Sequence, residues 1–185
     1  AKRFAEAATA WDRLAREFPK SPEALSAKLN SGYARFQLGQ YSEAVIRFQT
    51  ARLDPGQAAV ADYWRGVSLK ALDKPQDAIA AFRQAEDGKP APDLARDIQF
   101  QWTDTEFRSR EYTQAATRFQ TVVRRWPKHP ANDQGLLYAT EALLLFSETV
   151  TDPAARQKQL GQIQALIDRF SREFPKSALA TRHRL

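Results

Sequence analysis

The sequence contains no cysteine and no methionine, and it has few glycines and only two histidines. Without cysteine, the chain offers no disulfide and no thiolate ligand for a metal ion. The 7 glycines and the well-separated prolines are typical of a helical protein rather than of a flexible linker. The longest apolar runs, such as Ala142–Phe146, are much shorter than the roughly 18 residues of a membrane-spanning helix. The sequence therefore predicts a nearly all-helical protein without a membrane-spanning segment.

The residues needed for catalysis or metal binding are also sparse. His129 and His183 lack neighbours at the spacing of a metal site or of a nucleophile and its base, and His129 in "PKHP" suits a turn. The sequence has no glycine-rich phosphate loop and no HExxH motif. We therefore expect no enzyme activity, no cofactor and no metal ion.

The charge balance is mildly basic. The 28 Lys and Arg exceed the 22 Asp and Glu, giving a formal net charge of +6, and the basic residues are scattered along the chain. A scattered surplus is typical of a solvated surface. The alternative is a regulatory domain that binds nucleic acid or another polyanion through Arg124, Arg125, Lys128 and the segment from Arg169 to Arg184.

One phrase, "REFPKS", occurs at residues 16–21 and again at residues 172–177. Aligning the chain on its prolines explains the recurrence, because comparable segments follow one another at intervals of 36, 35, 37 and 48 residues. The aligned prolines are Pro19, Pro55, Pro90, Pro127 and Pro175. Each is expected to follow the end of a helix, with Ser21 or Ser177 capping the next helix.

Ahead of the prolines, small and large residues alternate at helical spacing. In "GQYSEAVIRFQTARLDP", Tyr41, Ala44, Phe48 and Ala51 fall on one helix face. Twelve residues before Ala44 stands a second small residue, Gly32, which lets the preceding helix approach closely. The same relation holds for Gly66 with Ala78 and for Thr103 with Ala115. Each unit is therefore predicted to be a helix hairpin.

An insertion, "SETVTDPAARQ" at 147–157, lengthens the last unit. Proline is favoured in the first turn of a helix, behind a capping residue, which fits Pro22 after Ser21 and Pro153 after Asp152. The insertion is interpreted as a longer loop followed by an extended helix from about Pro153 to Phe174.

These units resemble the tetratricopeptide repeat (TPR) family, whose repeat of about 34 residues has small residues at its eighth and twentieth positions and a proline near its thirty-second. The resemblance divides the chain into half a repeat (1–21), three full repeats (22–57, 58–92 and 93–129), an irregular repeat with the insertion (130–176) and the start of a further helix (177–185). It implies an all-α fold, a right-handed superhelix of stacked antiparallel helix hairpins. We expect 1–185 to be a single TPR array and a fragment of a longer protein.

The family binds peptides or helices on a concave wall lined by the first helix of each repeat. Carrying over the family's wall positions selects Leu29, Tyr33, Phe36, Tyr63, Trp64, Val67, Phe100, Asp104, Phe107, Leu137, Tyr138 and Glu141. In one interpretation some of these residues, such as Phe36 and Trp64, belong to the core. In the other, Leu29, Tyr33, Tyr63 and Phe100 form a contiguous exposed apolar stripe, which indicates a protein-binding site.

The resemblance also predicts the kind of partner. Chaperone-binding members hold a carboxylate with Lys and Asn at positions where this chain has pairs such as Leu29 with Tyr33. An apolar or amphipathic peptide suits the wall better, with Arg35, Arg65 and Arg108 at the rim to meet acidic groups. We therefore expect a non-catalytic protein–protein interaction scaffold.

Two stretches, "SPEALSAKLNSGYARFQLGQYSEAVIRFQ" and "AAVADYWRGVSLKALDKPQDAIAAFRQ", are most similar to bacterial envelope members of the family, namely the periplasmic coordinator of the Tol-Pal system and the outer-membrane assembly lipoprotein BamD. This resemblance implies a periplasmic or outer-membrane-associated protein, with the cytoplasm as the alternative. Uncovered apolar faces in "FAEAATAW" and "KSALATRHRL" predict that the protein continues in both directions or that its ends pair with another copy.

Overall fold

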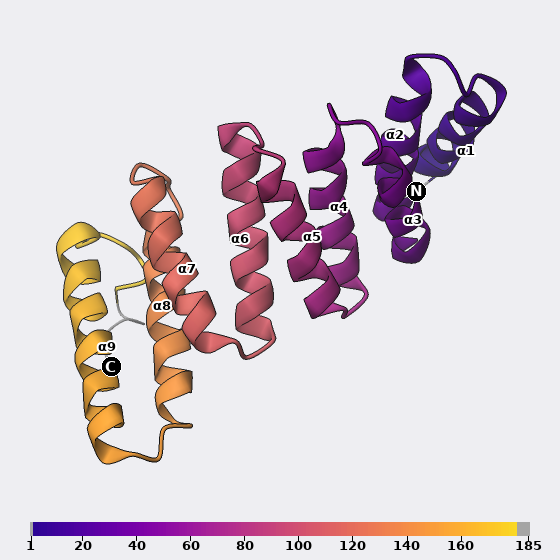
Figure 1. Ribbon diagram of the computed structural model, residues 1–185. Helices are drawn as coiled ribbons and strands as arrows, with labels where there is room; N and C mark the ends of the chain where they lie inside the picture. The colour runs from indigo at the N-terminus through magenta and orange to yellow at the C-terminus, as the bar shows by residue number, and fades with distance from the viewer. Residues whose placement is uncertain (1, 181–185) are drawn as a thin grey trace. The chain divides into compact units, whose positions relative to one another are not determined.

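The computed structural model describes residues 2–180, and within them the chain forms helices and no strand (Figure 1). In chain order the helices are α1 (Lys2–Glu17), α2 (Glu23–Gln37), α3 (Tyr41–Ala51), α4 (Ala58–Ala71), α5 (Pro75–Asp87), α6 (Pro92–Arg108), α7 (Tyr112–Arg125), α8 (Asn132–Ser147) and α9 (Pro153–Glu173). The predicted all-α class is confirmed.

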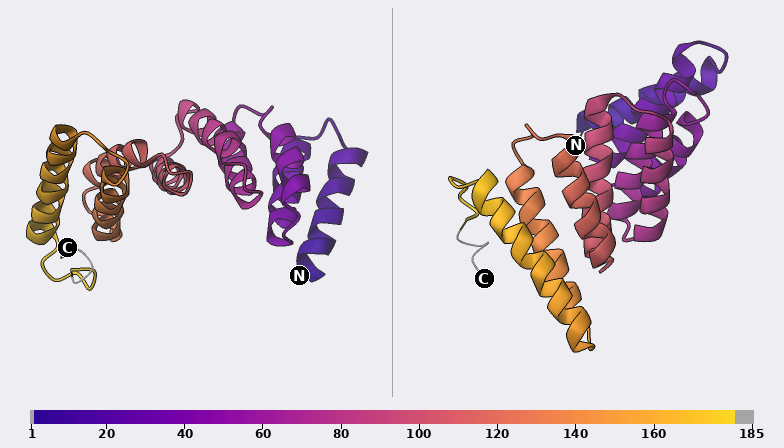
Figure 2. Two further views of the ribbon diagram at one scale, coloured as in Figure 1. Left: turned by 90° about the horizontal axis from the view of Figure 1, so that it is seen from below. Right: turned by 60° about the vertical axis from the view of Figure 1, so that its left-hand side comes forward.

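The chain divides into two compact units, and the division falls between Thr105 and Glu106, within α6. Unit 1 holds α1 to α5 and most of α6. Unit 2 holds the last residues of α6 together with α7, α8 and α9, and α8 lies between α7 and α9 (Figure 2). Each unit has an apolar core of its own. The expectation of one continuous array stays a prediction.

Two glycines allow the helices of a hairpin to lie close together. A Cβ atom at Gly32 of α2 would lie 2.7 Å from Cε1 of Phe48 in α3, and one at Gly66 of α4 would lie 2.6 Å from Cε1 of Phe82 in α5. Both rings are fully buried, so neither can move aside cheaply. The close approach predicted for the small residues is confirmed in the hairpins α2–α3 and α4–α5.

The turn inside a hairpin has the same left-handed backbone three times. Gly39, Asp73 and Arg110 occupy equivalent repeat positions and have φ values of 74°, 55° and 63°. In each turn, the following N–H donates to a carbonyl in the last turn of the preceding helix: Gln40 to Arg35, Lys74 to Leu69 and Glu111 to Glu106. Glycine adopts this conformation without strain, whereas Asp73 and Arg110 adopt it at a cost.

The starts of two helices test the predicted caps. Oδ2 of Asp152 accepts a hydrogen bond of 2.7 Å from the N–H of Ala155, and Pro153 begins α9, as predicted. The prediction that Ser21 caps α2 is wrong. The carbonyl of Ser21, not its hydroxyl, accepts the N–H of Ala24, because Pro22 already has helical backbone angles.

The second "REFPKS" leads into a turn. The Ser177 hydroxyl accepts the N–H of Leu179 at 3.1 Å and donates to Oδ2 of Asp133 at 2.7 Å, which fastens this segment to the start of α8. Residues 178–180 form a turn instead of the predicted further helix. The remainder of that predicted helix, 181–185, lies outside the described residues.

Candidate functional site

The helices of unit 1 form two layers. Tyr33 of α2 contacts Trp64 of α4, and Lys70 of α4 donates to Gln101 of α6, so α4 lies between α2 and α6. Helices α1, α3 and α5 pack behind this layer, with α3 against both α2 and α4. These three helices are called the rear layer below. The candidate site therefore belongs to the layer that α2, α4 and α6 form.

Four aromatic side chains meet on α2 and α4. The ring centroid of Trp64 lies 5.1 Å from that of Tyr33, 5.3 Å from that of Phe36 and 5.3 Å from that of Tyr63, each in an edge-to-face arrangement. Each such pair contributes about 0.5–1.5 kcal/mol beyond the area that it buries. The side chain of Tyr33 is 40% exposed. These four residues are called the aromatic face below.

The other predicted wall residues are less accessible than the sequence suggested. Ten of them are half-buried: Leu29, Phe36, Tyr63, Trp64, Val67, Phe100, Asp104, Phe107, Tyr138 and Glu141. Tyr63 and Val67 pack against the core of unit 1. The predicted stripe of Leu29, Tyr33, Tyr63 and Phe100 is thus strongly exposed only at Tyr33.

Leu137 is 2% exposed, so the prediction that it lines an open wall is wrong. The reason is the position of α8, which lies between α7 and α9 and buries residues on most of its circumference. Helical spacing assigns a residue to a face, but it does not show that the face is open.

A polar cluster takes the place of aromatic rings where α4 meets α6. Phe36 contacts Trp64 between α2 and α4, and the equivalent residues of the next two repeats are Lys70 and Gln101. Nζ of Lys70 donates to Oε1 of Gln101 at 2.8 Å and pairs with Oδ2 of Asp104 at 2.5 Å. The aromatic face therefore ends at α4 within unit 1.

Two of the three predicted rim arginines are engaged inside the fold. Arg35 pairs with Asp12 of α1 and reaches Oε1 of Gln40 at 3.4 Å. Arg65 pairs with Asp62 at 3.0 Å and with Gln49 and Gln84 of the rear layer. Both side chains turn toward the rear layer, and their contact with a partner's acidic groups stays a prediction. Arg108, the third, is exposed.

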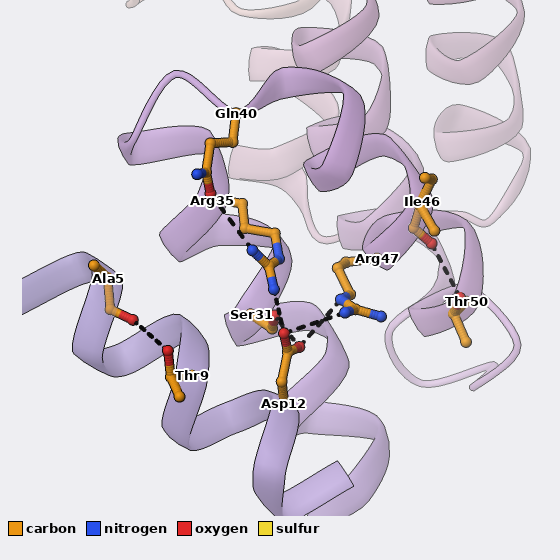
Figure 3. A network of polar contacts seen from close by, with 9 residues as sticks. All are labelled: Ala5, Thr9, Asp12, Ser31, Arg35, Gln40, Ile46, Arg47 and Thr50. Atoms are coloured by element: carbon orange, nitrogen blue, oxygen red, sulfur yellow. Dashed lines mark hydrogen bonds and ion pairs between the residues drawn. The ribbon is translucent and has the colours of Figure 1, made fainter. Parts of the chain in front are cut away.

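Asp12 joins three helices of unit 1, as Figure 3 shows. It accepts a hydrogen bond of 2.6 Å from the Ser31 hydroxyl and pairs with Arg35 of α2 and with Arg47 of α3, the latter at 3.1 Å. Burial raises the pKa of Asp12, but the hydrogen bonds from Ser31 and Arg35 and the charges of Arg47 and Arg35 outweigh burial. The pKa of Asp12 therefore lies below its ordinary value.

Asp62, unlike the half-buried Asp12, is almost fully buried, at 2% exposure. It pairs with Nε of Arg52 at 2.9 Å and with Nη2 of Arg65 at 3.0 Å. Burial lowers the pKa of Arg65, and the charge of Asp62 opposes that change. These ion pairs fix α4, which carries two residues of the aromatic face, and sequence spacing gave no sign of them.

Tyr63 connects the aromatic face to α6. Burial, and to a lesser extent the negative charge of Asp97, raises the pKa of the Tyr63 hydroxyl. Tyr63 therefore stays neutral near pH 7 and keeps an O–H group that can donate.

Unit 2 repeats the aromatic arrangement in part. Phe107 contacts Tyr112 at 5.9 Å and Tyr138 at 6.0 Å between ring centroids, where unit 1 has Phe36, Tyr41 and Trp64. Beside it, the carboxylate of Glu106 is held by Nε of Arg118 at 2.9 Å. Tyr41 was assigned to a helix face by its spacing, but the contact of Tyr41 with Phe36 and that of Tyr112 with Phe107 were not foreseen.

The described residues give little support to other kinds of site. Nδ1 of His129 accepts the N–H of Ala131 at 3.2 Å, in the turn before α8, as its predicted turn position requires. Residues 2–180 contain no group of three side chains able to hold a metal ion. No helix within them is long and apolar enough to cross a membrane. His183 lies outside the described residues.

A tetratricopeptide repeat model matches residues 1–58 and, in a second register, residues 29–95. The two matches together span just over half of the chain, and the chain belongs to the TPR family. None of the curated proteins compared with the chain matches it. The likeness to envelope members of the family stays a prediction.

Three solved structures show the same fold. The MamA protein matches with 16% identity and a TM-score of 0.68, over 97% of this chain and 88% of its own. YrrB, described as a TPR protein with an unusual peptide-binding site, matches with 16% identity and a TM-score of 0.65, over 98% of this chain and 83% of its own. The TPR-like repeats of a kinesin light chain candidate from Podosopora anserina match with 15% identity and a TM-score of 0.64, over 92% of this chain and 90% of their own. At these identities the likeness concerns the fold, which is consistent with a protein-interaction scaffold.

Proposed function

We propose that this chain is a non-catalytic scaffold that binds a segment of a partner protein on the aromatic face of unit 1. The observation that carries the proposal is the exposed Tyr33 ring, which packs on Trp64 within a half-buried aromatic cluster. Rigid aromatic side chains provide large contact areas at low entropic cost and dominate many protein interfaces. The similar structure of YrrB supports the proposal, because that protein is described as having a peptide-binding site.

The proposed partner segment is apolar or amphipathic. Arg35 and Arg65 already pair with Asp12 and Asp62, so an acidic partner would have to compete with these carboxylates. The face also offers the exposed Tyr33 ring and the half-buried rings of Phe36, Tyr63 and Trp64. An apolar side chain that covers Tyr33 would bury the most exposed ring of the cluster.

Affinity measurements on two alanine variants test this proposal. Peptides are selected from a random phage-displayed library on the whole 185-residue chain, and the tightest is measured with Tyr33→Ala and Ile46→Ala. Ile46 of α3 is the matched control because it is 61% exposed but lies in the rear layer. The proposal predicts that Tyr33→Ala weakens binding roughly tenfold. It predicts no change for Ile46→Ala and unchanged helicity for both.

Equal affinity of the Tyr33→Ala variant and the parent chain would overturn the proposal, and so would failure to select any peptide. Loss of helicity in Tyr33→Ala would assign that residue to the core instead of to a binding surface. A selected peptide whose binding falls steeply with salt would favour the polyanion alternative, since apolar contacts respond weakly to ionic strength.

We also propose that the protein works in the bacterial envelope. The proposal rests on the predicted resemblance of residues 21–49 and 58–84 to envelope members of the family. Fractionation of cells that express the protein at its native level tests this. Recovery with the periplasm or outer membrane is expected, and recovery only with the cytoplasm would contradict it.

Pairing of two copies remains a separate proposal. Its support is α1, where Ala10, Leu14 and Phe18 line an open hollow of about 750 Å³ on the helix surface. Light scattering across a concentration series tests it. A Phe18→Glu variant should remove any dimer, and a monomer at every concentration would contradict pairing.

A further inference from the structure

A second hollow lies in unit 2, between the facing sides of α7 and α9, and has a volume of about 410 Å³. Its apolar part comes from all three helices of the unit: Ala116 of α7, Leu143 of α8 and Leu166 of α9. These three residues belong to the buried core of unit 2, so the apolar surface of the hollow is fixed by packing. Its size suits one or two apolar side chains rather than a whole helix.

The charged residues that line this hollow are cationic, and the other polar residues are neutral. Arg169 and Arg172 of α9 line it, and no carboxylate does. Arg169 pairs with Glu173 at 2.7 Å, whereas Arg172 is exposed and has no polar partner among residues 2–180. Arg124 follows Gln120, another lining residue, by one helical turn and so lies on the same side of α7.

Together these features describe one kind of ligand. An apolar floor favours burial of an aliphatic side chain, and an unpaired arginine at the edge favours a carboxylate, to which guanidinium groups bind through two parallel hydrogen bonds. A phosphate of a nucleic acid could pair with Arg172, but it would leave the apolar floor of the hollow uncovered.

We propose that the hollow between α7 and α9 binds a short acidic segment of a partner protein, one in which a leucine-sized side chain stands next to a carboxylate. The leucine would cover Leu143 and Leu166, and the carboxylate would pair with Arg172. This site is separate from the aromatic face of unit 1 and does not depend on the function proposed for that face.

Two synthetic peptides, GDELLEDG and GKKLLKKG, test the proposal because they share the leucines and differ in charge sign. Each is titrated into the isotope-labelled 185-residue chain, and amide shifts are followed by NMR. The acidic peptide should shift the signals of Ala116, Ala165, Arg169 and Arg172 and should bind roughly tenfold more tightly than the basic one.

Two variants locate the site. Arg172→Glu should weaken binding of the acidic peptide roughly tenfold. Arg156→Glu, an exposed change on the same helix outside the hollow, should leave its affinity unchanged. Ala165→Leu, which fills the hollow from an exposed position, should also abolish the shifts at Ala116.

Several outcomes would overturn the proposal: no binding, shifts that lie outside the hollow, or equal binding of the two peptides. Equal losses of affinity in Arg172→Glu and Arg156→Glu would show that the peptide is attracted by the overall charge of the chain and not by this site. A single-stranded oligonucleotide that displaces the acidic peptide from these signals and binds more tightly would assign the hollow to nucleic acid instead.

Discussion

Nζ of Lys70 lies 2.5 Å from Oδ2 of Asp104, at the join between α4 and α6. One repeat earlier, the equivalent join is made by Phe36 against Trp64. The same repeat position is therefore aromatic at one join and ionic at the next. This change limits the aromatic face of unit 1 to α2 and α4, and it places the proposed binding surface on those two helices.

A glycine pair tests the close packing of the hairpins. Gly66→Ala should lower the free energy of unfolding by about 2 kcal/mol, because the new Cβ atom would lie 2.6 Å from the buried Phe82 ring. Gly161→Ala in α9 is the matched control, since a Cβ atom there meets nothing within 4 Å. It should raise stability by about 0.5–1 kcal/mol through helix propensity alone. Urea unfolding of both variants checks this, and equal effects would contradict the packing argument.

The left-handed turns predict a stabilising change. Arg110 has a φ of 63° at the position where the first hairpin has Gly39. Arg110→Gly should therefore raise the free energy of unfolding by about 1 kcal/mol, because glycine adopts this conformation without strain. Gly39→Ala should lower it by a similar amount, about 1 kcal/mol. Thermal unfolding measures both, and a destabilised Arg110→Gly variant would show that contacts of the arginine side chain outweigh the strain.

Removal of a buried charge should be costly at Asp62. Asp62→Ala leaves Arg52 and Arg65 without their carboxylate inside unit 1, and a loss of about 3–5 kcal/mol is expected. Asp93→Ala removes an exposed partner of Arg96 and should cost less than about 0.5 kcal/mol. The urea concentration at the midpoint of unfolding, measured for both variants, tests this difference. A small loss for Asp62→Ala would mean that water replaces the carboxylate easily.

The lowered pKa of Asp12 predicts how stability depends on pH. The ionised carboxylate stabilises the fold above its unfolded-state pKa of about 4, and this contribution is lost as the pH falls through the still lower folded-state pKa. At pH 7, Asp12→Asn should cost about 2 kcal/mol. The difference between the two proteins should shrink below a pH of about 4. Urea unfolding at pH 7, 4 and 3 measures it, and a difference that is constant with pH would contradict the ion-pair role of Asp12.

The features that the sequence predicted well are local ones. Gly32 and Gly66 were assigned to close helix contacts from their spacing alone, and both meet a buried phenylalanine ring. Asp152 and Pro153 mark the start of α9 because cap and first-turn preferences act over a few neighbouring residues. Such signals survive folding because the residues that create them lie within one helix hairpin or within a few positions of each other.

The features that the sequence did not predict involve partners that lie far apart in the chain. Arg35 was expected at an open rim, but Asp12, on a different helix, holds its guanidinium in the rear layer. A long, flexible side chain can reach either side of its helix, so the nearest carboxylate decides its direction. Leu137 was expected in an open wall and is buried, because the packing around α8 decides which faces are covered.

One measurement tests the central claim most directly: titration of the isotope-labelled chain with the tightest peptide selected on it, followed by NMR of the aromatic side chains. The account predicts that the ring signals of Tyr33, Tyr63 and Trp64 shift together with the same Kd, while Tyr112 and Tyr138 of unit 2 do not move. Shifts confined to unit 2, or to α1 and α3, would contradict a binding surface made by the aromatic face.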